Sequence, residues 1–295
     1  MDLQQLIHFL AVAKAGNFTL AGQDVGISQP ALSRSIQKLE KVVGEPLFER
    51  LPRGVALTEL GVFLQIRARQ IVDLVDDTFA ELSDASNRGR VRLAVIPTIA
   101  PYLLPSVLRK FGRQFPEIQV QVQEDTTRNI LRLCRDGEID LAIVALPITE
   151  KYLEVETLFE EELTLVLPKG HDLESKKQIT LTDIQDYPFI SLDQQHCLSD
   201  NIADFCQRQS IAPITIERTN QLATIQELVA LDHGISIIPA MAKHLDKSKR
   251  RVYREFAGEK PMRTIALLQN PYRFEHRFVN TFKQHMREFA ASIKA

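Results

Sequence analysis

The 295-residue sequence lacks tryptophan, holds only three cysteines, and contains no apolar run long enough to cross a membrane. Its first residues carry no cluster of positive charge, and the apolar run that follows is short and interrupted by His8, which excludes the usual pattern of a secretion signal. We therefore expect a cytoplasmic protein without a membrane segment. In that compartment cysteines are thiols by default, and a disulfide between two of them is expected to have a redox function and not a structural one.

A strong charge of one sign is also missing. The formal net charge is −2 and the sequence pI about 6.4, so any DNA contact has to come from a local basic patch. The hydrophobic content of 44% and the charged content of 25% are those of an ordinary globular protein, and the length allows two domains. The sequence shows no zinc-ligand spacing and no Gly-rich phosphate loop, so we expect no metal and no cofactor.

Residues 19–43 follow the pattern of two helices separated by a tight turn. Gly26 can adopt the positive φ that such a turn often needs, and Ser28 is the expected N-cap of the second helix. Leu32 and Ile36 recur at helical spacing and face inward, which leaves the opposite face polar. The residues expected to contact DNA from that face are Gln29, Pro30, Ser33, Arg34 and Gln37. This pattern is typical of a helix-turn-helix, whose second helix enters the major groove.

The flanking segments extend this motif. An amphipathic stretch at residues 3–13 predicts a helix that packs across the other two. Downstream, extended runs at 47–50 and 55–57 flank the turn Pro52–Gly54, a pattern typical of a β-hairpin wing. The wing residues expected to reach DNA phosphates are Arg50 and Arg53.

A long helix is predicted after the wing. Thr58 is its expected cap, and apolar residues recur along it from Leu60 to Leu82. A lone helix of this length would expose a long apolar stripe, so we expect it to pair with the same helix of a second chain. Packing of the stripe onto its own domain is the alternative.

Two motifs and the long helix give this sequence a family resemblance. Ser-Gln-Pro-Ala-Leu-Ser at 28–33 and Leu-Thr-Glu-Leu-Gly at 57–61 resemble LysR-type transcriptional regulators. The resemblance implies a regulator, not an enzyme, that binds double-stranded promoter DNA, acts with RNA polymerase, and assembles through its linker helices as a homodimer or homotetramer. It also implies a winged helix-turn-helix domain at 1–58, a linker helix at 59–88 and a regulatory domain at 89–295.

From residue 89 onward, strand and helix patterns alternate, which predicts an α/β fold with mostly parallel sheets. The expected strands are 91–95, 118–122, 141–145, 163–167, 189–192, 234–238 and 264–268, and the expected helices are 102–114, 129–135, 200–209, 221–231 and 275–291. The family implies a periplasmic-binding-protein-like domain with two subdomains, I at about 89–163 and 268–295, and II at about 164–267. The cleft between them would collect the strand ends and helix N-termini where such folds bind ligands.

Two of the three cysteines lie nine positions apart. Cys197 precedes a predicted helix and adjoins His196, a position that lowers the pKa of a thiol and favours the thiolate. Cys206 falls on the apolar face of that helix, and Cys134 has the pattern of a core residue. Along an intact helix the Cα atoms of Cys197 and Cys206 would lie about 13 Å apart, whereas a disulfide needs about 7 Å or less. Bonding therefore requires unwinding, and two unrelated cysteines are the alternative.

The segment around this pair carries a finer resemblance. His-Cys-Leu-Ser-Asp at 196–200, followed by Phe-Cys at 205–206, resembles the OxyR-like, hydrogen-peroxide-sensing branch of the LysR-type family. Further matches are residues 96–105, Thr127 and 263–265. The resemblance implies that peroxide oxidises Cys197 to a sulfenic acid and that Cys206 resolves it as a disulfide, which changes promoter binding. The residues implied to hold peroxide or to favour the thiolate are Thr98, Thr127, His196, Asp200 and Arg263.

One position departs from that pattern. Ser199 stands where the branch usually carries arginine, and loss of this cation is expected to raise the pKa of Cys197. Some LysR-type proteins keep the His-Cys-Leu segment while binding small organic effectors, so a regulator controlled by a metabolite in the cleft is the alternative. A solute-binding protein would have no use for residues 28–43, and a thiol peroxidase would need a reductant-docking scaffold that the sequence does not show.

Overall fold

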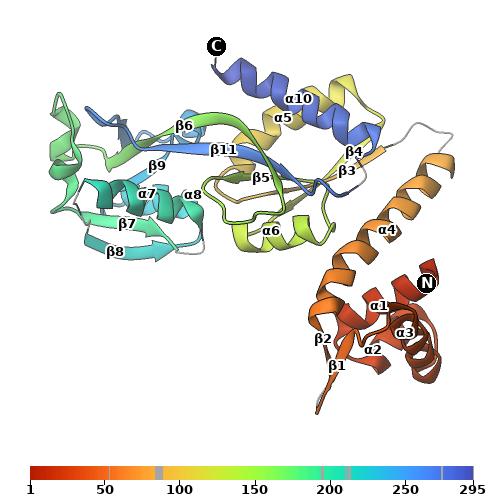
Figure 1. Cartoon of the computed structure of the whole chain (residues 1–295). Helices are drawn as coiled ribbons and strands as arrows, with labels where there is room; N and C mark the ends of the chain where they lie inside the picture. The colour runs from red at the N-terminus through yellow and green to blue at the C-terminus, as the bar shows by residue number, and fades with distance from the viewer. Residues whose placement is uncertain are drawn as a thin grey trace. The chain divides into compact units, whose positions relative to one another are not determined.

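The computed structural model describes residues 1–52, 54–83, 89–193, 196–209, 211, 214–273 and 275–294. It separates into two compact units (Figure 1). The first holds Met1–Asn87 with the short segments Arg135–Glu138 and Asn270–His276, and the second holds the remainder. Among the described residues, no helix is both long and apolar enough to cross a membrane.

The first unit contains the predicted helix-turn-helix and wing. Its elements are α1 (Leu3–Ala15), α2 (Phe18–Val25), α3 (Gln29–Val43), β1 (Phe48–Leu51) and β2 (Gly54–Leu57), followed by α4 (Glu59–Ser83). Asn17 caps α2 through its side-chain oxygen, and Gly26 ends it with a φ of 72°. Ser28 is the N-cap residue of α3, as predicted, although its side chain makes no capping hydrogen bond. Buried Leu32 and Ile36 fix the inward face of α3.

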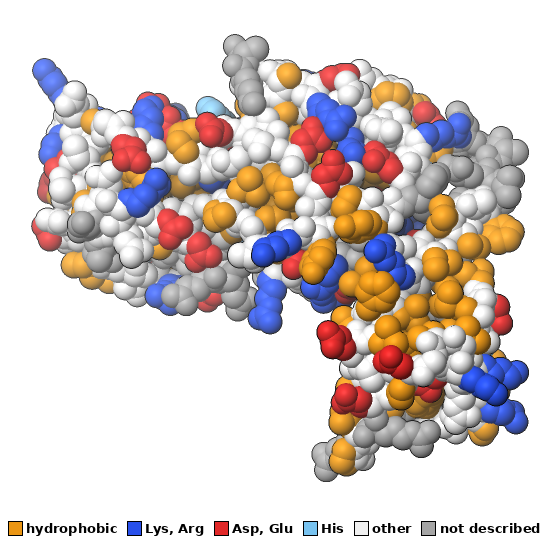
Figure 2. All heavy atoms as spheres, in the orientation of Figure 1, with side chains coloured by type: hydrophobic (Ala, Val, Ile, Leu, Met, Phe, Trp, Pro, Cys, Tyr) orange, Lys and Arg blue, Asp and Glu red, His pale blue; other side chains and the backbone are white. Residues whose placement is uncertain are grey.

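The long helix α4 starts where the sequence predicts. Thr58 Oγ1 accepts a hydrogen bond from Gly61 N at 3.0 Å, which satisfies one of the free N–H groups of the first turn. Figure 2 shows hydrophobic side chains along this helix. The exposed large ones are Val62, Phe63, Ile71, Leu74 and Phe79. Leu60, Leu64 and Val72 pack against the core of the first unit, as the alternative expects. The exposed residues still leave part of the apolar surface of α4 in contact with solvent, which favours pairing with a second copy.

The second unit is a mixed α/β structure. Its described strands form a sheet of order β10–β6–β11–β5–β3–β4 with β9 paired to β6, and a separate β7–β8 pair. The strands are β3 (Gly89–Val95), β4 (Ile118–Glu124), β5 (Leu141–Ala145), β6 (Glu154–Pro168), β7 (Pro188–Leu192), β8 (Ile214–Thr219), β9 (Ser236–Pro239), β10 (Arg251–Arg254) and β11 (Met262–Gln269). The helices are α5 (Ala100–Gln114), α6 (Thr127–Arg135), α7 (Cys197–Arg208), α8 (Leu222–Ala230), α9 (Ala240–Leu245) and α10 (Arg277–Lys294), with 3₁₀ turns η1 (Asp172–Ser175) and η2 (Leu181–Ile184).

Two long strands connect the halves of this unit. β6 and β11 run antiparallel to each other, and β11 pairs with β5 while the far end of β6 pairs with β9 and β10. Buried residues form one cluster around β3, β5 and α5, hereafter subdomain I, and another around β7, α7 and α8, hereafter subdomain II. The two subdomains therefore have separate cores joined by β6 and β11.

The prediction of mostly parallel sheets was wrong. In the described part of the second unit, β3–β4, β3–β5 and β7–β8 are parallel, whereas every pair that includes β6 or β11 is antiparallel. The strand predicted at 163–167 in fact begins at Glu154. Its first half was not predicted because repeated glutamates hide the alternation of apolar and polar residues there. The short strands β8 and β10 and the helix α9 were not predicted.

Candidate functional site

Both cysteines of the predicted pair lie in α7. Cys197 is its first residue, His196 is its N-cap, and Cys206 follows in the same unbroken helix. Nine residues at about 1.5 Å each place their Cα atoms about 13 Å apart. Both cysteines are free thiols, and they cannot approach within disulfide distance while α7 is intact.

The two thiols occupy different environments. Cys197 is half-buried and packs against the core of subdomain I, although its helix belongs to subdomain II. Cys206 is buried in the core of subdomain II, and burial raises the pKa of its thiol to about 11. Cys134 is fully buried as predicted, and burial with the nearby charge of Asp140 raises the pKa of its thiol to about 12. Cys206 and Cys134 are therefore protonated at neutral pH, and Cys197 is the accessible sulfur.

A buried ion pair lies on the strands that join the subdomains. The Arg263 side chain is fully buried, and its Nε donates to Glu161 Oε2 at 2.8 Å. Its Nη1 and Nη2 donate to Thr98 Oγ1 at 3.0 Å and to Thr98 O at 3.1 Å. Glu161 Oε1 accepts from Met241 N at 2.7 Å, at the start of α9. The charge of Arg263 is thus balanced by Glu161, and the guanidinium holds Thr98 in place.

The other predicted residues of this set lie at helix starts. Thr127 begins α6, and its buried Oγ1 has no hydrogen-bond partner among the described residues. His196 is buried, and this burial lowers the pKa of its ring more than the negative charge of Asp193 raises it. The ring is therefore neutral at pH 7. Partial desolvation and the charge of Asp204 raise the pKa of Asp200. Among the described residues of the predicted set, side-chain hydrogen bonds join only Thr98 and Arg263.

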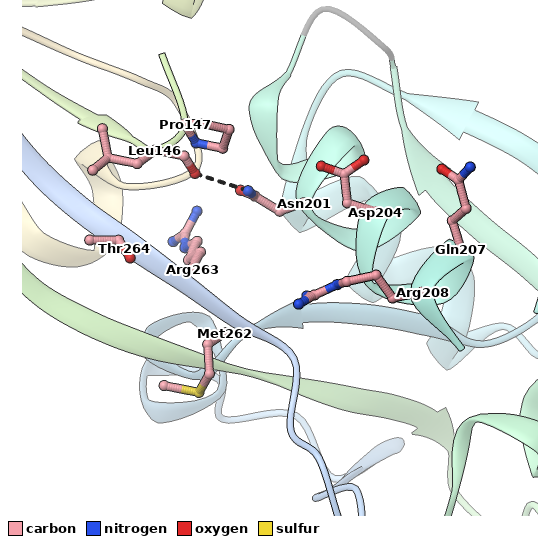
Figure 3. Close-up of a pocket in the computed structure, with 9 residues that line it drawn as sticks. All are labelled: Leu146, Pro147, Asn201, Asp204, Gln207, Arg208, Met262, Arg263 and Thr264. Atoms are coloured by element: carbon pink, nitrogen blue, oxygen red, sulfur yellow. Dashed lines mark hydrogen bonds between the residues drawn. The ribbon is translucent and has the colours of Figure 1, made fainter. Parts of the chain in front are cut away.

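A pocket of about 680 Å³ lies beside α7 and β11 (Figure 3). It is lined by Leu146, Pro147, Asn201, Asp204, Gln207, Arg208, Met262, Arg263 and Thr264. Asn201 and Arg208 lie on the face of α7 that carries Cys197, at spacings of four and eleven residues. Asn201 Nδ2 donates to Leu146 O at 3.0 Å, while its buried Oδ1 has no partner in the described part of the chain. The pocket has both polar and apolar lining residues and about the volume of a small-molecule site.

Ser199 takes a structural role in the first turn of α7. Its Oγ donates to Leu192 O at 2.7 Å and lies 3.1 Å from Asp193 O. From the sequence, Ser199 was interpreted only as a missing cation, and neither Asn201 nor Glu161 was predicted as part of the site. A buried arginine needs a carboxylate partner, so the three glutamates at 160–162 could have indicated that one of them pairs with Arg263.

In the first unit, α3 presents the predicted polar face. Gln29, Pro30, Arg34 and Gln37 are exposed, and Ser33 is half-buried. Figure 2 shows Lys and Arg side chains over this helix. Arg50 is a backbone member of β1, but its side chain and the whole of Arg53 lie outside the described residues.

Polar contacts fix α3 within its unit. His8 of α1 is buried, and its Nδ1 lies 2.7 Å from Ser35 Oγ on α3. Glu40 Oε1 accepts from Leu47 N at 2.8 Å, where the chain enters the wing. Neither contact was predicted from the sequence. They hold the exposed face of α3 on a rigid support, which a helix that reads base edges requires.

Two family models match the chain. "Bacterial regulatory helix-turn-helix protein, lysR family" matches residues 3–62, and "LysR substrate binding domain" matches residues 84–291. A relative from Mycobacterium avium, described as a "probable hydrogen peroxide-inducible genes activator", is 34% identical over 88% of this chain and 85% of its own length.

Solved structures agree with these matches. A full-length OxyR from Pseudomonas aeruginosa with one cysteine replaced is 26% identical, with a TM-score of 0.77 over 97% of this chain and 95% of that one. A cysteine-to-serine mutant of Corynebacterium glutamicum OxyR with hydrogen peroxide bound is 28% identical, with a TM-score of 0.62 over 99% of this chain and 96% of that one. The chain belongs to the LysR family of bacterial helix-turn-helix regulators.

Proposed function

We propose that this protein is a transcriptional regulator that binds promoter DNA through α3 and senses hydrogen peroxide through Cys197. The arrangement of α7 carries the proposal, because an accessible thiol begins the helix and a buried, protonated thiol lies on the same helix. The M. avium relative is described as a peroxide-inducible activator, and the C. glutamicum structure contains peroxide. Both support peroxide as the signal here and Cys197 as its target.

In the first step, the Cys197 thiolate attacks one oxygen of hydrogen peroxide. The S–O bond forms as the O–O bond breaks, the second oxygen leaves as hydroxide and is protonated to water, and the sulfur becomes a sulfenic acid. Cys197 lies at the positive end of the α7 helix dipole. We assign the holding of peroxide to Thr98, Thr127, His196 and Asp200. Arg263 acts on this site through its hydrogen bonds to Thr98.

In the second step, the sulfur of Cys206 attacks the sulfenic sulfur of Cys197. The S–S bond forms as the S–O bond breaks, and the leaving hydroxide combines with the thiol proton of Cys206 to give water. The helix holds the two Cα atoms about 13 Å apart, so part of α7 unwinds before this bond forms. Cys197 thereby leaves the core of subdomain I, and this change alters promoter binding.

Assembly and location complete the proposal. The exposed stripe of α4 pairs with that of a second chain, which gives a homodimer or homotetramer that acts in the cytoplasm with RNA polymerase. We assign residues 1–58 to DNA binding, 59–88 to the linker and 89–295 to regulation. Subdomain I takes about 89–163 and 268–295, and subdomain II about 164–267.

A metabolite-controlled regulator is the second candidate function. The pocket beside α7 favours it, because the cavity has about the volume of a small-molecule site and contains Asn201 Oδ1, a buried acceptor for which the described part of the chain offers no partner. A small effector in this cavity would contact the same helix that carries the cysteines. Its binding would change the second unit without any change in thiol oxidation.

Mass-spectrometric mapping of the three cysteines before and after stoichiometric peroxide tests the proposal. We expect Cys197 and Cys206 to lose their reactivity toward an alkylating reagent as a disulfide-linked peptide forms, while Cys134 stays reduced. Promoter footprints recorded on the same samples should change together with that disulfide. If Cys197 remains reduced at neutral pH, peroxide sensing is wrong and the metabolite candidate takes its place.

A further inference from the structure

The first turn of α7 is hydrogen-bonded to the strand that precedes it. Ser199 Oγ donates to Leu192 O at 2.7 Å, and Asp193 O lies 3.1 Å from the same hydroxyl. Leu192 is the last residue of β7, so a helix side chain here bonds the end of a strand. Backbone bonds run in parallel, from Ser199 N to His196 O at 2.9 Å and from His196 N to Asp193 O at 3.1 Å.

This hydrogen bond must break before the disulfide can form. Ser199 stands between Cys197 and Cys206, in the segment that the proposed function requires to unwind. Once the first turn unwinds, the Ser199 hydroxyl can no longer stay on the Leu192 carbonyl. The hydrogen bond therefore stabilises the helical state relative to the state in which the two sulfurs meet.

The same bond takes no part in the peroxide step. A serine hydroxyl has one proton, and the geometry commits that proton to the carbonyls of Leu192, at the end of β7, and Asp193, which follows it. The hydroxyl is thus engaged away from the Cys197 sulfur, and attack on peroxide takes place with α7 intact. Removal of the hydroxyl leaves the first chemical step unchanged and lowers the barrier to the second.

We infer that Ser199 is a positioning residue, a latch that holds the first turn of α7 and slows disulfide formation after Cys197 is oxidised. The inference rests on the proposed function. Its consequence is a longer-lived sulfenic acid at Cys197, which a cellular thiol can reduce before the conformation locks. The latch therefore sets how long or how strong a peroxide pulse must be before promoter binding changes.

Rapid-quench kinetics on the full-length protein separates the two steps. Sulfenic acid formation is second order and rises with peroxide concentration, whereas disulfide formation is first order and independent of it. Ser199→Ala should raise the first-order constant about three- to tenfold, the range expected for one hydrogen bond, and leave the second-order constant unchanged. Ser199→Thr, which keeps a hydroxyl, should restore the slow first-order step.

Ser191→Ala is the matched control. Ser191 Oγ also donates to Leu192 O, at 3.1 Å, but from within β7, so its loss alters the same carbonyl without releasing α7. The control should keep the wild-type first-order constant. An unchanged constant in Ser199→Ala, or an equal rise in Ser191→Ala, overturns the latch.

A second measurement separates failure of the latch from failure of peroxide sensing. In the reduced protein, Ser199→Ala should speed amide hydrogen exchange at residues 198–201, and Ser191→Ala should not. If exchange is unchanged while Cys197 still oxidises normally, the latch alone is wrong. If the wild-type Cys197 does not oxidise, the proposed function is wrong, whatever the exchange result.

Discussion

The buried pair of Glu161 and Arg263 gives a large and checkable effect on stability. Glu161→Gln keeps an oxygen that can accept from Met241 N but removes the charge that balances Arg263. The guanidinium is fully buried, so the variant leaves a cation without a counterion inside the protein. Removal of one partner of such a pair typically costs about 3–5 kcal/mol. For a unit of this size that loss lowers the midpoint of thermal unfolding by about 6–20 °C.

Thermal and urea unfolding of the full-length protein, observed with a spectroscopic probe in the second unit, measure this effect. Glu160→Gln is the matched control, because Glu160 is an exposed neighbour on the same strand, and its midpoint should stay near wild type. The double variant Glu161→Gln with Arg263→Met removes both charges and should recover part of the loss. A midpoint for Glu161→Gln within about 2 °C of wild type, or under 1 kcal/mol of lost stability, refutes the reasoning.

Arg34→Ala should weaken specific operator binding by about 1–3 kcal/mol in footprint titrations, and unchanged footprints would contradict the assignment of α3. Leu74→Glu places a charge in the exposed stripe of α4 and should shift the protein toward monomer in light scattering; a monomeric wild type would refute that interface. Cys206→Ser should accumulate sulfenic or over-oxidised Cys197 without a lasting change in DNA binding, and a lasting change would exclude the disulfide as the switch. Burial lowers the pKa of His196 from 6.5, so the unfolded chain takes up its proton first. Stability from this group is full above pH 6.5 and falls below it, and His196→Gln should flatten that slope in urea titrations.

The parts of the fold that depend on local pattern were predictable from the sequence. The turn at Gly26, the apolar spacing of α3 and the start of α4 each follow from a few neighbouring residues. The buried strand β5 also appears at its predicted position, because an uninterrupted apolar run marks it. Strand direction was not predictable in this way. β6 and β11 cross between the subdomains, and their antiparallel pairing depends on segments about a hundred residues apart.

The same distinction explains which parts of the candidate site were missed. Cys197, Cys206 and Thr127 carry a signal in their own segments, since each lies on or at the start of a recognisable helix. The pairing of Glu161 with Arg263 exists only because the register of β6 and β11 places these two residues opposite each other.

Ser199 is a further case, because a missing cation was visible in the sequence, whereas the hydrogen bond that replaces it was not. Its partner is a backbone carbonyl at the end of β7, and every residue type offers such a carbonyl, so side-chain pattern carries no trace of the contact. The same holds for Asn201, which donates to the carbonyl of Leu146. Side chains that bond to distant backbone therefore determine how firmly α7 is held, and they become apparent only once the chain is folded.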